Sequence, residues 1–594
     1  MIANRSPAPS TLKWLYITIA ILVAIFLSIA FLINYRLKPY ASNKIRTAVH
    51  ESTHGLYNVD FKDIHISLFK GAITFDSLSF KPDTSVIQAL REKDDAPKHI
   101  YQFDIKALAF RNISFWDVYF RKKIDMESVV IYKPQITVTY NNFKTREEED
   151  VKRAAYQQIS KFLRSIHVNY LIVNDAELQY VDKSDGPIQT TNFKGLNIKV
   201  TEFRLDSASQ YDKNNFYYTQ NIQLNLKDHK FTTNDGLYTI TVADITSSTS
   251  GRNLRFNGLT IKPKYPGMEF SRKYKEQHDR YDINCKEIIL TDIDFYRLNV
   301  YRRLNASSLI ISGAEVKIFM NRELPPVTFD KGRNYPHMIL RRLKLKTTID
   351  TVLMKNMSIS YSEYNPMSQK KGTVSFNRFN ALIRNVSNDS VGLSANHWLR
   401  AAVSTWIMNK GKMNVNINMN LIAKNADFNF NGSMGRMDMR ELNSLSRNMS
   451  LAEIESGTIN KAEFKVSGNL RTTSGYLKLH YTNLKVNVLK GDEDSGELEK
   501  RGLISAIANS IVIKNDNPDK DGKLRIGKAD AERINSASFF NLMWKSIFSG
   551  LKESVGFTLG SPEKLQVIKP VTKQEQRKAD REQRREERKA KRKN

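Results

Sequence analysis

Residues 101–138 read YQFDIKALAFRNISFWDVYFRKKIDMESVVIYKPQITV, and residues 281–318 read YDINCKEIILTDIDFYRLNVYRRLNASSLIISGAEVKI. The second stretch lies 180 positions after the first and aligns with it without a gap. In both copies apolar and polar residues alternate in short runs, which is the period of a half-buried strand. A repeat at a fixed offset predicts that the chain is built from duplicated β-rich modules. Six positions are identical: Tyr101/Tyr281, Lys106/Lys286, Ile113/Ile293, Phe115/Phe295, Ser128/Ser308 and Ile131/Ile311.

The repeat extends beyond this core on both sides. The further matching pairs are Gly71–Pro82 with Gly251–Pro263, and Tyr170–Tyr180 with Thr351–Tyr361. We therefore expect a first β-rich module at residues 36–220 and a second at residues 221–400. Two architectures stay open: two separate β-sandwich domains, or one continuous sheet that is extended by repetition.

The N-terminal segment predicts a membrane anchor. Trp14–Ile33 contains no charged residue over 20 positions, which is long enough for a helix to span a bilayer. A cleaved signal peptide would have a shorter apolar core and a small-residue cleavage site. We expect residues 14–35 to form a transmembrane helix after a short N-terminus at residues 1–13. Basic residues flank the segment on both sides, so charge alone leaves its orientation open.

The composition points to phosphate-bearing partners. The chain has 92 Lys and Arg against 62 Asp and Glu, a formal net charge of +30. Such a charge suits anionic lipid, and no aromatic-basic motif for nucleic acid accompanies it, so we predict no nucleic-acid partner. Cys285 is the one cysteine of the chain and can form no intramolecular disulfide. It occupies a strand position of the repeat, so we predict a small core residue.

Residues 401–530 carry the clearest strand pattern. Met413–Asn420 reads MNVNINMN, with apolar side chains on one face and asparagines on the other. An apolar sheet face must be buried by a second sheet, by closure into a barrel, or by an apolar ligand in a groove. The predicted groove lining in this region is Met413, Val415, Ile417, Met419, Leu477, Leu479, Val486 and Val488.

The C-terminal end combines an amphipathic helix with a basic tail. Ser536–Phe557, within residues 531–560, has an apolar side that suits a membrane interface. The alternative is that this helix plugs the end of the sheet. Residues 561–594 form a basic tail with too few apolar residues for a core. The predicted membrane-interface residues are Phe540, Met543, Trp544, Ile547 and Leu551.

One sequence motif suggests catalysis. His50-Glu51-Ser52-Thr53-His54 matches the H-E-x-x-H pattern of zinc peptidases, but no third ligand follows at a known spacing. The sequence has no P-loop, dinucleotide-binding glycine motif, nucleophile elbow or paired-cysteine metal spacing. We therefore predict a protein that is not an enzyme, with no cofactor and no metal, and keep the zinc peptidase as a remote alternative.

The order of these parts resembles the AsmA-like family of the Gram-negative envelope. The likeness lies in the anchor and in three stretches: VDFKDIHISLFKGAITF (residues 59–75), FNGSMGRMDMRELNSLSRNMSLAEIESGTINKAEFKVSG (residues 430–468) and GYLKLHYTNLKVNVL (residues 475–489). The resemblance implies an inner-membrane, single-pass protein with a cytoplasmic N-terminus and its bulk in the periplasm. Larger members such as TamB and YhdP are similar to chorein-type lipid bridges, which hold lipid tails in a β-groove.

Together these observations predict a mainly β fold. A transmembrane helix precedes an elongated, repeat-built antiparallel sheet that curves into a groove, with short helical inserts and a C-terminal amphipathic helix. The resemblance implies binding of the acyl chains of phospholipids or other envelope lipids, and a role in phospholipid transport for outer-membrane biogenesis. An outer-membrane or periplasmic partner protein is a further candidate. The alternative is a structural scaffold or regulator of outer-membrane assembly that carries no lipid.

Overall fold

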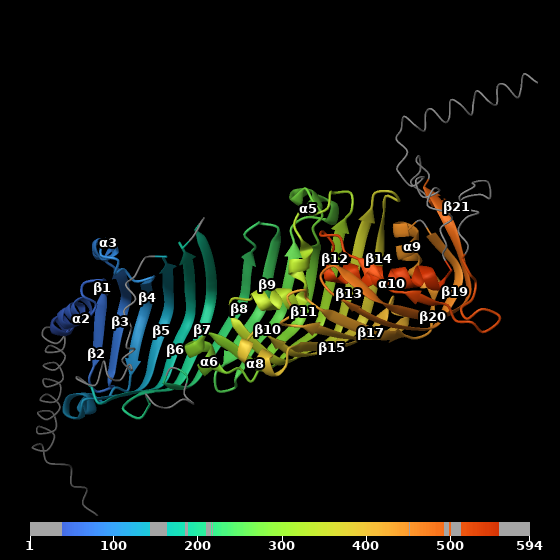
Figure 1. Cartoon of the computed structure of the whole chain (residues 1–594). Coiled ribbons are helices and arrows are strands. Elements are labelled where there is room, and N and C mark those ends of the chain that lie inside the picture. Colours follow the sequence, from blue (N-terminus) through green and yellow to red (C-terminus); the bar gives the residue numbers. More distant parts are fainter. Residues whose placement is uncertain are drawn as a thin grey trace, which may run out of the picture. The chain divides into compact units, whose positions relative to one another are not determined.

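The computed structural model describes residues 38–142, 163–184, 188–209, 216, 218–450, 452–491, 498–500 and 513–556. The predicted mainly β class is confirmed, with extensive curved and open antiparallel sheet (Figure 1). The predicted anchor at residues 14–35 and the basic tail at residues 561–594 lie outside the described residues. Within the described ranges, no helix is both long enough and apolar enough to cross a membrane.

The chain divides into two compact units. Unit 1 comprises Met1–Lys264, Ile283–Ser312 and Leu345–Asp350, and unit 2 comprises Tyr265–Asp282, Gly313–Lys344 and Thr351–Asn594. Strands β11, β12 and β13 contribute residues to both units. The boundary that the sequence predicts at residues 220/221 therefore falls inside unit 1.

Unit 1 is a sheet with a few short helices at its margins. Its elements are α2 (Lys38–Ser52), β1 (Tyr57–Asp60), β2 (Asp63–Ser67), β3 (Ala72–Pro82), α3 (Thr84–Glu92), β4 (His99–Arg111), η2 (Asp117–Arg121), β5 (Lys123–Tyr140), β6 (Ser165–Asp182), β7 (Gln189–Leu205), β8 (Thr219–Thr232), β9 (Tyr238–Ser248), β10 (Asn253–Pro263), α6 (Phe295–Tyr301), and parts of β11 (Arg280–Thr291) and β12 (Arg303–Asn321).

The strands of unit 1 form one ladder that follows the chain. β1 and β2 both pair with β3, and each strand from β3 to β10 pairs with the next. These pairings are antiparallel except β5 with β6, which is parallel. β8 spans the predicted module boundary and pairs with both β7 and β9. At this junction the modules share a continuous sheet, as the second of the two open architectures requires.

The predicted repeat is visible in the strands themselves. β3, β4, β5, β6 and β7 recur in the same order as β10, β11, β12, β13 (Lys346–Asn365) and β14 (Lys370–Ser387). Short helical connections recur as well, since η2 follows β4 and α6 follows β11. Two backbone details repeat at the same spacing. Asn112 and Asp292 both have φ of 53°, while Lys122 and Arg302 have φ of 54° and 53°.

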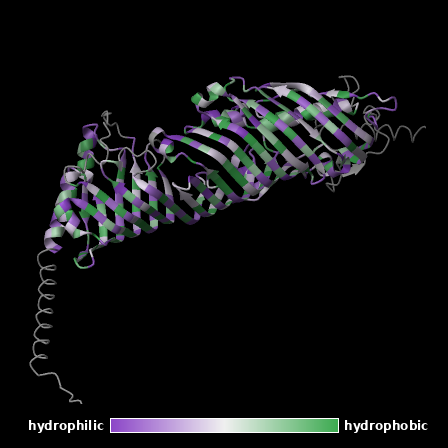
Figure 2. Cartoon of the chain, turned by 90° about the horizontal axis from the view of Figure 1, so that it is seen from below, coloured by the Kyte–Doolittle hydropathy of each residue, from purple (hydrophilic) through white to green (hydrophobic). Residues whose placement is uncertain are grey.

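Hydrophobic and hydrophilic residues alternate along the strands of unit 1 (Figure 2). One face carries a row of apolar residues that the strand register places side by side: Phe75, Leu108, Ile131, Val173, Ile198 and Leu224. The opposite face carries cross-strand polar pairs. Asp244 accepts hydrogen bonds from Asn225 at 2.7 Å and Asn257 at 3.2 Å, and Arg255 pairs with Glu287 at 2.7 Å. The alternation within each strand therefore separates an apolar from a polar surface.

Unit 2 contains more helices. Besides β13 and β14 it holds α5 (Gly267–Tyr274), η4 (Lys331–Asn334), α7 (Pro336–Arg342), α8 (Ser390–Ala395), β15 (Trp398–Ile407), β16 (Gly411–Asn420), β17 (Phe428–Met434), β18 (Met437–Asp438), η5 (Met439–Leu442), α9 (Asn443–Ser450), β19 (Ala452–Gly468), β20 (Thr472–Gly491), β21 (Leu498–Lys500), β22 (Ile526–Lys528), β23 (Ala531–Glu532) and α10 (Phe539–Ser554). Its strands β14 to β17 pair in order, and β17 then pairs with β19 and β19 with β20.

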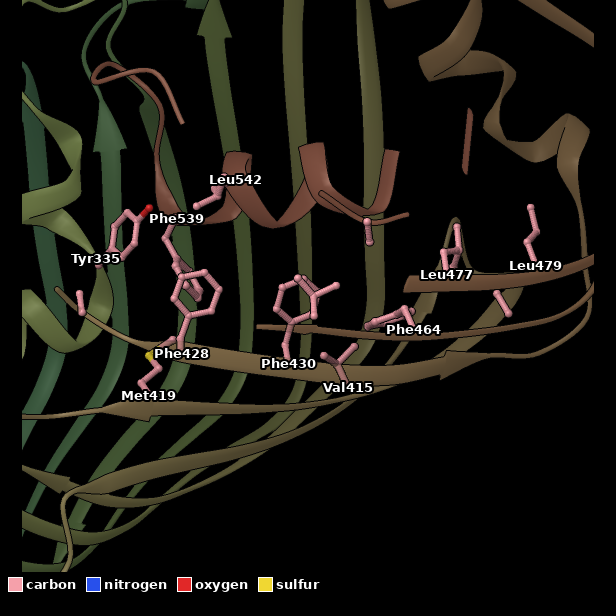
Figure 3. Packing of buried hydrophobic residues seen from close by; sticks show 14 of the residues in the cluster. Tyr335, Val415, Met419, Phe428, Phe430, Phe464, Leu477, Leu479, Phe539 and Leu542 are labelled. Carbon is pink, nitrogen blue, oxygen red and sulfur yellow. The ribbon is translucent and has the colours of Figure 1, made fainter. Parts of the chain in front are cut away.

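Helix α10 covers the apolar face of the unit 2 sheet (Figures 1 and 3). Ser538 caps its N-terminus by accepting a hydrogen bond from the Asn541 amide at 3.3 Å. Close approach to β20 needs small residues on the helix. A Cβ atom at Gly550 would lie 2.8 Å from the Cβ of Leu477. The hydroxyls of Ser546 and Thr473 lie 2.5 Å apart and join helix and strand beside it.

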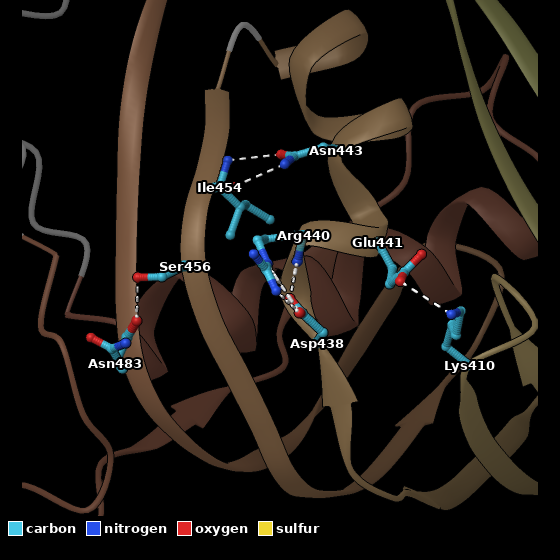
Figure 4. A network of polar contacts seen from close by, with 8 residues as sticks. All are labelled: Lys410, Asp438, Arg440, Glu441, Asn443, Ile454, Ser456 and Asn483. Carbon is cyan, nitrogen blue, oxygen red and sulfur yellow. Dashed lines mark hydrogen bonds and ion pairs between the residues drawn. The ribbon is translucent and has the colours of Figure 1, made fainter.

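Polar side chains hold η5 and α9 against β19 (Figure 4). The Asn443 side chain accepts a hydrogen bond from the Ile454 amide and donates one to the Ile454 carbonyl, both at 2.8 Å. Arg440 and Asp438 form a two-pronged ion pair, with the shortest contact at 2.6 Å. These contacts lie within residues 430–468 and stabilise the local fold there.

Candidate functional site: the apolar sheet faces

The groove-lining residues predicted from the sequence lie on β16 and β20 of unit 2. Val415 and Met419 are buried, as are Leu477 and Leu479, the last two with 2% of their surface exposed. Met413, Ile417 and Val486 are partly buried against the same cluster. For Val488, the structure gives its backbone pairing with Ala452. The seven predicted lining residues other than Val488 therefore lie together in one hydrophobic cluster.

This cluster is filled by the protein's own side chains. Phe539 of α10 and Tyr335 pack against Phe428, with ring centroids of Phe428 and Phe539 4.9 Å apart (Figure 3). Leu542 of α10 belongs to the same cluster. Phe539 is 2% exposed and Leu542 is fully buried. In this structure the predicted lining is therefore the core beneath α10, and a ligand could reach it only if α10 moved away.

The five predicted membrane-interface residues fall on two sides of α10. Met543, Ile547 and Leu551 pack against the core cluster. Phe540 and Trp544 point away from it, with 67% and 51% of their surface exposed. The helix thus plugs the sheet of unit 2, as the alternative interpretation predicted, and its outer side carries the remaining two aromatic residues.

Unit 1 presents an apolar face without such a plug. In the described part of unit 1, α2 packs at the first strands, where Ala41 and Ile45 contact the cluster of Phe61, Ile64 and Phe75. Helix α6 reaches the start of β8, where Phe295 lies against Phe216 with ring centroids 5.8 Å apart, but no described helix of this unit runs over the middle of β4 to β10 (Figure 1). Of the six residues in the row, Leu108, Ile131, Ile198 and Leu224 are partly buried, and Phe75 and Val173 are buried. The eight steps from β3 to β11, at about 4.8 Å each, make this face about 38 Å wide.

Further apolar residues extend this face toward β11. Leu226, Ile245, Phe256 and Ile288 lie side by side on successive strands. An aromatic row runs along one margin of the sheet, with ring centroids 4.5 Å apart for Tyr57 and Phe80 and 5.6 Å apart for Phe80 and Phe103. We name the surface formed by the apolar residues of β3 to β11 the unit 1 apolar face.

The titratable groups on this face are adapted to an apolar environment. His229 stacks on Phe193 at 4.8 Å, and burial lowers its pKa below the ordinary value, which favours the neutral imidazole. Cys285 lies beside Leu259 and is 2% exposed, and burial raises the pKa of its thiol. The predicted burial of Cys285 in a strand is confirmed. Neither side chain adds a charge to the face near neutral pH.

The histidines of the zinc-like motif are not arranged on one helix. α2 ends at Ser52, and His54 follows it in a left-handed turn with φ of 51°. The Nδ1 atom of His50 lies 3.0 Å from the Asn58 side-chain oxygen. Within the described ranges, no three His, Cys, Asp or Glu side chains gather in a way that could hold a metal ion. The ligand geometry that the motif requires is therefore absent from these residues.

Comparison with known proteins gives no further assignment. No protein-family model matches the chain, and no curated protein is significantly similar to it in sequence. The likeness to the AsmA-like family thus stays an interpretation of sequence pattern and order.

The sequence analysis did not identify the unit 1 apolar face as the sheet surface that a helix of its own unit leaves uncovered. The signal was present, because the alternating residues of the repeated stretch, such as Phe103 and Ile131, are part of this face. The pattern of a strand shows which side is apolar but not what covers it. Coverage depends on distant elements such as α10, and the sequence does not place them.

Proposed function

We propose that the chain binds lipid acyl chains on the unit 1 apolar face. The observation that carries this proposal is a continuous row of apolar residues across β3 to β8, with no described unit 1 helix over the middle of β4 to β8. Leaving such a surface in water is unfavourable, and each CH₂ group of a lipid buried there contributes about 0.8 kcal/mol. Large exposed apolar surfaces generally mark interaction sites.

The wider role follows from the predicted anchor and the charge. An uncharged run at Trp14–Ile33 would hold the chain in the inner membrane, with its bulk in the periplasm. The net charge of +30 suits phospholipid headgroups. We propose participation in phospholipid transport for outer-membrane biogenesis, in line with the resemblance to the AsmA-like family. No bond is broken in this role, so no catalytic residue is assigned.

Lipid content tests the proposal. Residues 36–594 are purified without the predicted anchor, extracted with organic solvent and examined by mass spectrometry. We expect co-purified phospholipid, and we expect Leu224→Asp to reduce it severalfold because the carboxylate lies on the apolar face. Gln223→Asp is the matched control, since Gln223 is the preceding residue of β8 and is exposed on the opposite face.

A second pair keeps the test informative if Leu224→Asp destabilises the fold. Phe231 extends from the apolar face at the end of β8 and is 43% exposed, so Phe231→Asp is expected to fold. Its matched control is Lys230→Asp. A folded protein that carries no lipid, and takes up none from vesicles, would contradict the proposed function.

A structural scaffold is the second candidate function. The filled core beneath α10 favours it, because that part of the sheet is already closed by the protein itself. Under this alternative, Leu224→Asp would lower the melting temperature while the lipid content of the wild type is already zero. Melting curves and lipid analysis of the same samples distinguish the two functions.

A further inference from the structure

Two short helical connections lie at the same end of the unit 1 sheet. η2 joins β4 to β5, and α6 joins β11 to β12. The register places Arg111, at the end of β4, opposite Ser128 of β5, and places Leu290 of β11 opposite Leu254. The turn from β2 to β3 is at this end too, since the Ile113 amide donates a 2.7 Å hydrogen bond to the Gly71 carbonyl. We name these three connections the basal edge.

The basal edge exposes large aromatic side chains. In the first copy of the repeat, Trp116, Tyr119 and Phe120 are 67%, 80% and 59% exposed. Phe69 in the β2–β3 turn is 79% exposed. The rings contact one another rather than a core, with centroids of Trp116 and Phe120 4.1 Å apart. An exposed aromatic cluster of this size points to a partner surface.

The second copy repeats the pattern. Trp116 corresponds at the 180-residue offset to Tyr296 of α6, which is exposed, and Tyr301 at the end of the same helix is 59% exposed. Phe295 of this helix packs inward on Phe216, with ring centroids 5.8 Å apart. Aromatic exposure at the basal edge is therefore a feature of both copies and not a peculiarity of one turn.

Basic residues surround these rings. Lys70, Lys122 and Lys123 are exposed beside the first cluster, and Arg302 is exposed at the matching position of the second. Arg121 pairs with Asp117 at 2.9 Å, so part of the basic charge is balanced, while the lysines extend to solvent. Trp and Tyr favour the bilayer interface, and Lys and Arg nearby are attracted to anionic headgroups.

We propose that the basal edge docks on the surface of a bilayer that contains anionic phospholipid. The aromatic rings enter the headgroup region, and the lysines contact phosphate groups. A second copy of the chain is a poorer partner, because two basal edges would bring positive charges together. This inference is independent of acyl-chain binding on the unit 1 apolar face, since none of the basal-edge residues belongs to that face.

Site-specific fluorescence tests the proposal in the full chain. Tyr119→Cys and Tyr296→Cys are labelled with an environment-sensitive dye and reconstituted in vesicles of phosphatidylethanolamine and phosphatidylglycerol. Cys285 is buried, so the unmodified chain measures background labelling. Asn234→Cys is the control, because Asn234 is exposed in the β8–β9 turn at the opposite end of the strands. We expect nitroxide-bearing lipids to quench the labels at 119 and 296 and not the label at 234.

Charge variants complete the experiment. Near an anionic surface each basic residue contributes about fivefold to binding, so Lys122→Gln with Lys123→Gln is expected to weaken docking on the order of 25-fold. Lys98→Gln with Lys183→Gln removes two exposed lysines from the opposite strand ends and is expected to leave docking unchanged.

Equal lipid quenching at 119, 296 and 234 would overturn the proposal. A second result would also overturn it. If the labels at 119 and 296 are not quenched by lipid, are protected from an aqueous quencher, and become accessible to it on dilution, the partner is a second copy of the chain.

Discussion

At the scale of single residues, His337 is a buried titratable group in unit 2. It lies on α7 and has no exposed surface. Burial lowers its pKa, and Arg341 lowers it further, while the main chain of Ala426 and the carboxylate of Asp427 act in the opposite direction. The neutral imidazole is therefore the form that the folded protein favours.

His337 predicts a pH dependence of stability. The unfolded chain binds a proton near pH 6.5, and the folded chain binds it only at lower pH. The free energy of unfolding should therefore be constant above about pH 6.5 and fall, by at most about 1.4 kcal/mol per pH unit, as the pH drops from there toward the folded pKa. Denaturant titrations between pH 5 and 7 measure this slope.

Two variants assign the slope to this histidine. His337→Gln should reduce the slope, because this side chain no longer titrates, while His229, whose pKa burial also lowers, keeps its contribution. His99→Gln replaces an exposed histidine and should retain the wild-type slope. Equal slopes in the wild type and His337→Gln would contradict the assignment.

At the scale of elements, the two sides of helix α10 differ strongly in how far their side chains are exposed. Neighbouring phenylalanines on this helix face opposite ways, with Phe539 2% exposed and Phe540 67% exposed. Phe539 contacts Tyr335 and Phe428, with ring centroids at 5.1 and 4.9 Å. The helix is thus held to the sheet through one side only.

This asymmetry predicts unequal effects of the same substitution. Phe539→Ala should reduce the free energy of unfolding of unit 2 by about 3–5 kcal/mol, because it leaves a cavity under α10. Phe540→Ala should change it by no more than about 0.5 kcal/mol. Chemical denaturation of both variants measures the difference. Similar losses for the two would mean that α10 does not pack as the structure shows.

The same helix shows what sequence could and could not predict. The helix and its packed side were predictable from the spacing of Met543, Ile547 and Leu551, but Phe540, which was expected on the same side, points away from the core. The placement of the helix was not predictable, because a membrane and a sheet offer the same apolar environment to Ile547. The strands were predictable because their signal does not depend on distant elements. Their alternation is local, as in Met413–Asn420, and the alternation of residues 101–138 recurs in residues 281–318.

At the scale of the whole molecule, the two units differ in how the apolar face of their sheet is covered. Unit 2 covers β16 and β20 with α10. In the described part of unit 1, helix α2 covers only the first strands. The sequence predicted apolar faces in both but could not distinguish them, because burial by a helix and burial by a ligand leave the same pattern in the strand. The predicted lining was therefore assigned to the covered unit.

The central claim is that the unit 1 apolar face contacts acyl chains, and site-specific photo-crosslinking on β8 in living cells tests it most directly. A photoreactive amino acid replaces Ile222 or Leu224 on the apolar face, or Gln223 or Lys227 on the polar face, in the full chain. We predict lipid adducts at positions 222 and 224 and none at 223 and 227, because side chains alternate between the two faces. Adducts at all four positions, or at none, would contradict the account.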